Sequence, residues 1–251
     1  LSSFIQVVIF RDLKENISVI KLFSISVLSN FGKYIPGKIW ASLGYVFYLK
    51  KEGIQLNKSA QVIILHNIAG NLIGGIFLIG IMIIHPKILG YSGQILMYII
   101  ILLLLITVFV FPVIYNSLNR ILYKWRFANL NNDIISISYI LILKVLLLST
   151  LYWLIMSIGF YYFSNGIISQ HLTFEPYFIA ILPASWTLGF IALFAPGGIG
   201  VRETALVFFL MPIVNEVNAV QISILSRIEF TIISLVLGLF SFYYLGKFKM
   251  K

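Results

Sequence analysis

Two interrupted apolar stretches decide the expected fold. The first is Ser29-Asn30-Phe31-Gly32-Lys33-Tyr34-Ile35-Pro36-Gly37-Lys38, and the second is Leu193-Phe194-Ala195-Pro196-Gly197-Gly198-Ile199-Gly200-Val201-Arg202-Glu203. Each places Pro-Gly and at least one cation inside a run that is otherwise typical of a membrane-embedded segment. Proline cannot donate a backbone hydrogen bond and disfavours helix in the residue before it, so each stretch should break a helix. In lipid, such a break must be surrounded by protein or by a water-filled cavity.

The composition indicates a membrane protein. Hydrophobic residues make up 60% of the chain and charged residues 10%, whereas soluble domains average roughly 45–50% and about 25%. With a mean hydropathy of +1.01, we expect an all-α, polytopic transmembrane bundle that forms a single integral membrane domain over residues 1–251. The chain starts at Leu1 and shows no signal-peptide pattern, so we expect a fragment that lacks N-terminal sequence.

Charge sets the expected orientation. Long apolar spans are predicted at 59–84, 93–115, 135–163 and 219–246. The cations behind the net charge of +10 gather at 50–58, at 116–134 and at the C-terminus, which places these segments in the cytoplasm by the positive-inside rule. The prediction is therefore a multi-pass protein of a prokaryotic cytoplasmic membrane, with a cytoplasmic C-terminus and no nucleic-acid partner.

Two broken hairpins follow from this orientation. The loop at 164–176 carries no Lys or Arg and is predicted to lie outside. Because the last span must start outside, residues 177–214 must enter and return, as a hairpin broken at Pro196-Gly197. If the first broken hairpin, 17–49, also re-enters, but from the cytoplasm, the pair forms the inverted repeat seen in transporters. The alternative is that both segments are full, tilted spans.

The second break is the stronger candidate binding site. Arg202 and Glu203 open an apolar helix directly after Gly197, Gly198 and Gly200. A helix N-terminus offers free N–H groups and a partial positive charge, and glycines let a ligand approach the backbone closely. We predict a substrate site for an anion here. The alternative is a tight turn with Arg202 extended to the membrane interface.

Four further charges are candidates for the same site. Lys33 and Lys38 flank the first break and offer cations to a phosphate, or else serve only as positive flanks of a short span. Arg227 and Glu229 lie within the last span; two positions apart on a helix, they diverge by about 200° and cannot pair with each other. Glu203 and Arg202 are the expected partners, with a purely structural ion pair as the alternative.

Other intramembrane polar residues are interpreted as packing groups. His66, Asn67 and Asn71 suit interhelical hydrogen bonding, and the tryptophans, including Trp186, are assigned to interfacial belts or packing. The sequence contains no Walker lysine motif, HExxH or GxSxG. We therefore expect no catalytic residue, no cofactor and no metal.

The two breaks resemble the paired signatures of a known family. Asn30…Pro36-Gly37-Lys38 and Pro196-Gly197-Gly198-Ile199-Gly200-Val201-Arg202-Glu203 are similar to patterns of the lysylphosphatidylglycerol synthase transmembrane-region family, also described as flippase-like integral membrane proteins. The early pattern is approximately N-x-x-P-G-R-x-G and the late one P-G-G-x-G-x-R-E. The resemblance implies lipid handling: the movement of aminoacylated phospholipid, or a role in polyprenyl-linked glycan assembly.

The early half departs from the family pattern. Lys38 stands where the family usually has Arg, Trp40 where Gly is common, Tyr45 where many members have Arg, and His66-Asn67 near where many have Glu-Arg. The first half is therefore poorer in charge than the family pattern.

Two functions from different classes are compatible with these residues, and a structural scaffold for a cell-envelope assembly complex is a third that nothing in the sequence excludes. The first is a lipid translocase that moves an anionic or aminoacylated phospholipid, or a polyprenyl-phosphate-linked glycan precursor, so that its partner is a membrane lipid. The second is a membrane-embedded glycosyltransferase or an accessory subunit of glycan assembly. The second needs a catalytic acid on an outer loop, for which Glu175, Glu203 and Glu216 are the candidates.

Overall fold

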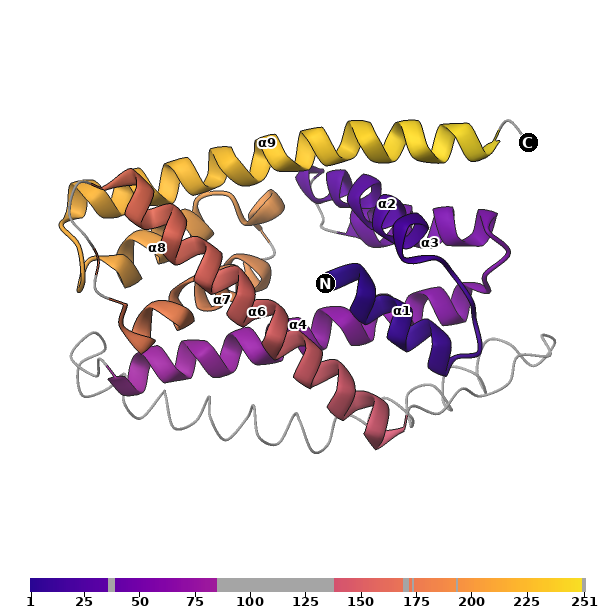
Figure 1. Cartoon of the computed structure of the whole chain (residues 1–251), viewed down its shortest axis with the longest axis horizontal. Coiled ribbons are helices and arrows are strands. Elements are labelled where there is room, and N and C mark those ends of the chain that lie inside the picture. The colour runs from indigo at the N-terminus through magenta and orange to yellow at the C-terminus, as the bar shows by residue number, and fades with distance from the viewer. Residues whose placement is uncertain (36–38, 85–137, 169–171, 173, 193, 250–251) are drawn as a thin grey trace.

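The computed structural model describes residues 1–35, 39–84, 138–168, 172, 174–192 and 194–249, and in these ranges it is helical with no strand. This confirms the predicted all-α membrane bundle (Figure 1). The helices are α1 (Ser2–Asp12), α2 (Val19–Asn30), η1 (Phe31–Tyr34), α3 (Ile39–Lys51), α4 (Leu56–Ile84), α6 (Tyr139–Ile167), α7 (Pro176–Ile191), η3 (Pro196–Gly198), α8 (Val201–Leu210) and α9 (Glu216–Lys249).

Three of the described helices are long and apolar enough to cross a bilayer: Leu56–Ile83, Tyr139–Ile167 and Glu216–Lys247. The predicted span 135–163 begins four residues too early, because Ser138 caps α6 by accepting a 3.1 Å hydrogen bond from the Leu141 backbone N–H. The predicted span at 93–115 lies outside the described residues.

At each interruption of a helix, the two helices on either side pack against each other. α2 and α3 contact each other across η1, and α7 and α8 contact each other across η3. In the first pair the approach is close, since a Cβ on Gly44 would lie 3.7 Å from Ser29. The two short helical turns, η1 and η3, also contact one another, so the tips of the two hairpins meet. Figure 1 shows the hairpins on opposite sides of this meeting point, α2–α3 towards the C-terminal end of α9 and α7–α8 towards its start.

The apolar core has two parts, one around each hairpin. One cluster is built on α1, α2, α3, α4 and the first half of α6, and includes Phe10, Tyr45 and Leu65. The other is built on α4, α6, α7, α8 and α9, and includes Tyr177 and Phe209. The α4–α7 contact is the most extensive between described helices. There α4 presents Gly74, where a Cβ would lie 2.9 Å from the Pro183 carbonyl oxygen.

Charged residues gather at one end of the bundle. Lys21 at the start of α2 pairs with Glu52 at 2.5 Å, and Lys58 of α4 pairs with Glu15 at 2.7 Å. The C-terminus of α9 lies at the same end in Figure 1. The outward faces of α6 and α9 carry large exposed apolar side chains, such as Leu147, Leu239 and Phe242, as expected for surfaces that contact lipid.

Candidate functional site

The second break is a glycine turn that leads into α8. Gly197, Gly198 and Gly200 have φ values of +60°, +72° and +84°, a region that side chains with a Cβ rarely adopt. Gly198 is also closely packed, because a Cβ there would lie 3.0 Å from the carbonyl oxygen of Gly189 on α7. The turn therefore places the first residues of α8 directly against α7.

Arg202, on the first turn of α8, is a buried cation without a hydrogen-bond partner at two of its nitrogens. Arg202 is only 5% exposed, and its Nε and Nη2 make no hydrogen bond with the described residues. The guanidinium carbon lies 3.9 Å from the ring centroid of Trp186 and 4.7 Å from that of Phe230, so two aromatic side chains hold it by cation–π contacts. A buried charge with unsatisfied hydrogen-bond donors is costly, so Arg202 has unused capacity to donate hydrogen bonds.

Glu203 closes the turn and ties it to α9. Its Oε2 accepts a 2.7 Å hydrogen bond from the Gly200 backbone N–H, which satisfies one of the free donors at the start of α8. Its Oε1 lies 3.1 Å from Nη1 of Arg227. This confirms the Glu203–Arg227 half of the predicted cross-pair; among the described residues Glu229 makes no ion pair with Arg202, so that half is wrong. In the same region Ser223 of α9 donates a 3.0 Å hydrogen bond to the Glu203 carbonyl oxygen.

The first break contributes a further cation. Lys33 on η1 lies with its Nζ 5.1 Å from the centroid of the Tyr34 ring. That ring packs against the second break, since a Cβ on Gly197 would lie 3.5 Å from it. Lys38 lies outside the described residues, so its predicted role stays a prediction.

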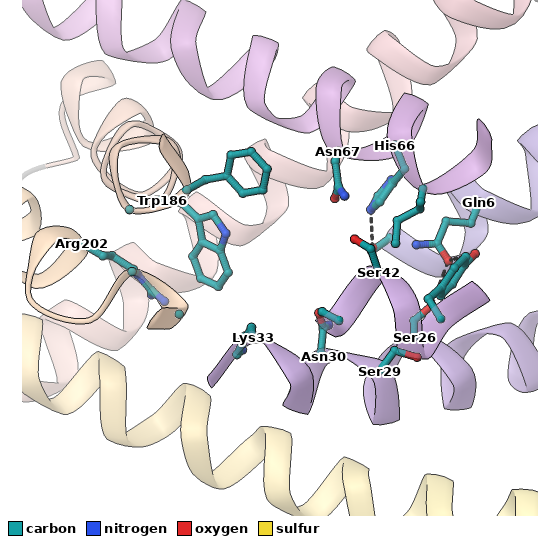
Figure 2. Close-up of a pocket in the computed structure, with 18 of the residues that line it drawn as sticks. Gln6, Ser26, Ser29, Asn30, Lys33, Ser42, His66, Asn67, Trp186 and Arg202 are labelled. Atoms are coloured by element: carbon teal, nitrogen blue, oxygen red, sulfur yellow. Dashed lines mark hydrogen bonds between the residues drawn. The ribbon is translucent and has the colours of Figure 1, made fainter. Parts of the chain in front are cut away.

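A cavity of about 270 Å³ lies where the two hairpins meet (Figure 2). Its cationic end is formed by Lys33, Arg202 and Arg227, with Gly197 and Gly198 beside them. Figure 2 shows Arg202, Trp186 and Lys33 towards one end of the space and Gln6, Ser26, Ser29, Ser42 and His66 towards the other, with Asn67 and Asn30 between. The cavity thus has a cationic end and an uncharged polar end.

A second space adjoins the first between α2, η1 and α9. It measures about 180 Å³ and shares Asn30 and Lys33 with the cavity. Its other lining residues are mainly apolar: Val27, Phe31, Tyr34, Ser234 and Leu237. We call this space the α2–α9 groove.

The remaining predictions for this region have mixed outcomes. Glu229 does not line the cavity, and it makes no ion pair with any residue in the described ranges. His66 bonds another helix as predicted, through Nε2 at 3.0 Å from Ser2 Oγ of α1, whereas the Asn71 side chain donates to the Asn67 carbonyl of its own helix. No group of three side chains with metal-ligand chemistry occurs among the described residues.

Part of the cavity lining was not predicted from the sequence. Trp186 is a packing residue, as predicted, but it also forms one wall of the Arg202 site. Gln6 and Ser26 were not among the predicted site residues, although each is a polar residue within an apolar segment. That exception to an apolar pattern was the available signal, because polar groups inside a membrane bundle tend to be functional or paired.

A family comparison identifies the family of the chain. A family model described as "Lysylphosphatidylglycerol synthase TM region" matches residues 3–238. The chain belongs to this family. Searches of curated proteins and of solved structures found no match. The match to the lysylphosphatidylglycerol synthase transmembrane region, together with the three spanning-length helices, makes the chain a multi-pass integral membrane protein of a lipid-related family.

Proposed function

We propose that this chain is a flippase-like lipid translocase. It moves a lipid with a phosphate-bearing head group, either an anionic phospholipid or a polyprenyl-phosphate-linked precursor, across the cytoplasmic membrane of a prokaryote. The single observation that carries the proposal is Arg202, which is 5% exposed, without a hydrogen-bond partner at Nε and Nη2 among the described residues, and on the wall of a cavity between two broken hairpins.

The electrostatics favour a phosphate at this point. Lys33, Arg202 and Arg227 line the cavity, and Glu203 offsets one of these charges through its ion pair with Arg227. The start of α8 adds the partial positive charge of a helix N-terminus. A guanidinium group can bond two phosphate oxygens in parallel, which suits Arg202 to be the principal anion contact.

The hydrocarbon chain of the lipid has a separate path. The α2–α9 groove shares Lys33 and Asn30 with the cavity and is lined mainly by apolar side chains. We infer that a head group bound in the cavity leaves its chain in this groove, towards the surrounding lipid. The head group then crosses the bilayer inside the protein. It avoids the hydrocarbon, where a charged group is costly.

We also propose that the two hairpins form an inverted repeat, as in transporters. We propose that 17–49 re-enters from the cytoplasm and 177–214 from outside, so that η1 and η3 meet near the membrane midplane. The contact between η1 and η3 and the cluster of charged residues at the C-terminal end of the bundle support this orientation. The transmembrane potential is worth about 2.3 kcal/mol per charge at 100 mV, enough to bias the movement of an anionic lipid.

The rival function, a glycosyltransferase, has less support from the site. It needs an acid beside the bound substrate, yet no Asp or Glu is among the described residues that line the cavity. Glu203 is engaged by Gly200 and Arg227, and Glu175 and Glu216 lie at the starts of α7 and α9. The translocase therefore remains the better account.

The test is head-group-resolved lipid movement in proteoliposomes. The native chain should move anionic phospholipid, and Arg202→Ala should abolish this movement while the protein stays folded. Lys144→Ala is the matched control, because Lys144 is an exposed cation on α6 that does not line the cavity. Native rates in Arg202→Ala, or equal loss in both variants, would overturn the role of Arg202.

A further inference from the structure

The uncharged end of the cavity is built from oriented polar side chains. Gln6 is 5% exposed, and its Oε1 accepts hydrogen bonds from Tyr45 Oη at 3.0 Å and from Ser26 Oγ at 2.9 Å. Because both hydroxyls donate to the oxygen, the amide nitrogen of Gln6 is left for the cavity, and Figure 2 shows it directed there. The two hydroxyls thus fix the side chain as a donor to whatever occupies this end.

Two more lining side chains, Ser29 at this end and Asn67 between the two ends, have unused hydrogen-bonding capacity. Ser29 is only 6% exposed, and its Oγ has no hydrogen-bond partner among the described residues. The carboxamide of Asn67 projects into the cavity between the two ends (Figure 2). Buried polar groups normally have partners, so an unpartnered hydroxyl on a cavity wall points to a ligand that supplies one.

The chemistry of this end is neutral throughout. Its polar lining consists of hydroxyl, carboxamide and imidazole groups, and the described cavity lining holds three cations and no carboxylate. A hydroxyl group both donates and accepts hydrogen bonds, and so do serine and carboxamide side chains. An ammonium group only donates hydrogen bonds, and the described cavity lining offers no carboxylate to balance its charge.

We propose that this end binds the hydroxyl groups of a small neutral polyol or sugar esterified to the phosphate, and that it rejects cationic, aminoacylated head groups. The inference rests on the proposed function and narrows its substrate class. The size agrees: about 270 Å³ is below the roughly 300–1,000 Å³ of typical pockets for drug-sized ligands, so the space holds a phosphate with one small ring or glycerol.

Three lipid probes test this selectivity in proteoliposomes of the full chain. They are phosphatidylinositol, phosphatidic acid and lysyl-phosphatidylglycerol, which present a phosphate with a polyol, a phosphate alone, and a phosphate with an aminoacyl cation. Phosphatidylinositol should move about tenfold faster than lysyl-phosphatidylglycerol, a ratio typical of leaving buried hydrogen-bonding groups unpaired. Equal or faster movement of lysyl-phosphatidylglycerol overturns the inference.

Variants of Asn67, which lies between the two ends of the cavity, should change this selectivity. Asn67→Leu should slow phosphatidylinositol about tenfold relative to phosphatidic acid, and Asn67→Ser should restore part of the difference. Asn71→Leu is the matched control, because Asn71 lies one helical turn away on α4 and does not line the cavity. If Asn67→Leu slows both lipids equally, the residue has a structural role and the inference fails.

Ser29→Ala distinguishes a ligand-binding role of the Ser29 hydroxyl from a structural one. Removing a buried, unpartnered hydroxyl should raise the thermal unfolding midpoint of the empty protein and at the same time weaken the preference for phosphatidylinositol over phosphatidic acid. A lower midpoint with unchanged preference contradicts the assignment.

Soluble probes separate this inference from the proposed function. Inositol 1-phosphate should bind the detergent-solubilised chain about tenfold more tightly than inorganic phosphate. If it does so while no lipid moves, the hydroxyl site stands, translocation is overturned, and the site belongs to a free phosphate ester. If lipids move but inositol 1-phosphate binds no better than phosphate, the translocase stands and the hydroxyl site is overturned.

Discussion

One carboxylate, that of Glu203, holds together the turn and the last span. Its Oε1 lies 3.1 Å from Nη1 of Arg227, and its Oε2 accepts a 2.7 Å hydrogen bond from the Gly200 backbone N–H. The same side chain therefore closes the glycine turn that positions Arg202 and fixes this turn against α9. Neutralising the charge and removing the side chain should consequently have different costs.

Glu203→Gln should destabilise the protein less than Glu203→Ala. The amide oxygen of Gln can still accept the bond from Gly200, so only the partly exposed ion pair is lost, at about 1 kcal/mol. Alanine also removes the cap, and the total loss should be about 2 kcal/mol. Unfolding in detergent measures both values. Glu216→Gln, at the exposed start of α9, is the control and should cost less than about 0.5 kcal/mol; equal losses for Gln and Ala at position 203 would exclude the capping role.

Phe230 should be energetically coupled to Arg202. The ring centroid lies 4.7 Å from the guanidinium carbon, and a cation–π contact of this kind contributes about 0.5–2 kcal/mol. A double-mutant cycle of Phe230→Leu with Arg202→Met should give a coupling free energy of about 1 kcal/mol in unfolding experiments.

The control is a second double-mutant cycle, in which Phe240→Leu takes the place of Phe230→Leu. Phe240 lies on the same helix and is 52% exposed, and its ring stacks on Tyr244. The Phe240→Leu and Arg202→Met changes should be additive. A coupling as large as that of Phe230 would show that the effect is not a contact with Arg202.

The sequence predicts the charged part of the site better than its walls. Arg202 and Glu203 follow a Pro-Gly turn. Because the side chains of Arg227 and Glu229 diverge on one helix, each must find a partner elsewhere, and this predicted the Glu203–Arg227 pair. By contrast, the contact of Trp186 with Arg202 depends on how α7 is rotated against α8. No local pattern encodes that rotation.

The uncharged end of the cavity could not be predicted from the sequence, because it too depends on how helices are placed against one another. Gln6 of α1 meets Ser26 of α2 and Tyr45 of α3, so its role depends on the relative positions of three helices. Hydrophobic periodicity finds helices but does not give their register against one another. The helical fold and the interruptions between α2 and α3 and between α7 and α8 were predictable, because they depend on composition, proline and glycine alone.

Gly198→Ala should destabilise the protein more than Gly53→Ala. Both glycines have positive φ, +72° and +82°, and in each variant that conformation costs about 1–2 kcal/mol. Only at Gly198 would the Cβ also meet backbone, at 3.0 Å from the Gly189 carbonyl oxygen, whereas it would have open space at Gly53.

The added contact should cost Gly198→Ala about 1 kcal/mol beyond the cost at Gly53. Because the displaced turn carries Arg202, lipid movement should also fall in Gly198→Ala and remain native in Gly53→Ala. Equal destabilisation of the two variants would show that α7 gives way to the new methyl group.

Gly238→Ala should slow lipid movement through the α2–α9 groove. A Cβ at Gly238 of α9 would lie 2.7 Å from the Phe31 ring, so the ring must shift, and Phe31 also lines the groove of about 180 Å³. The shifted ring should narrow the groove, and this overpacking costs about 1 kcal/mol, so lipid movement should fall about fivefold.

Gly246→Ala is the control, since nothing lies within 4 Å of its Cβ. This variant should move lipid at the native rate and gain about 0.5–1 kcal/mol of stability. The double variant Gly238→Ala/Phe31→Ala removes the displaced ring and should restore movement. Persistent slowing in that double variant would show that the groove is not the path of the lipid chain.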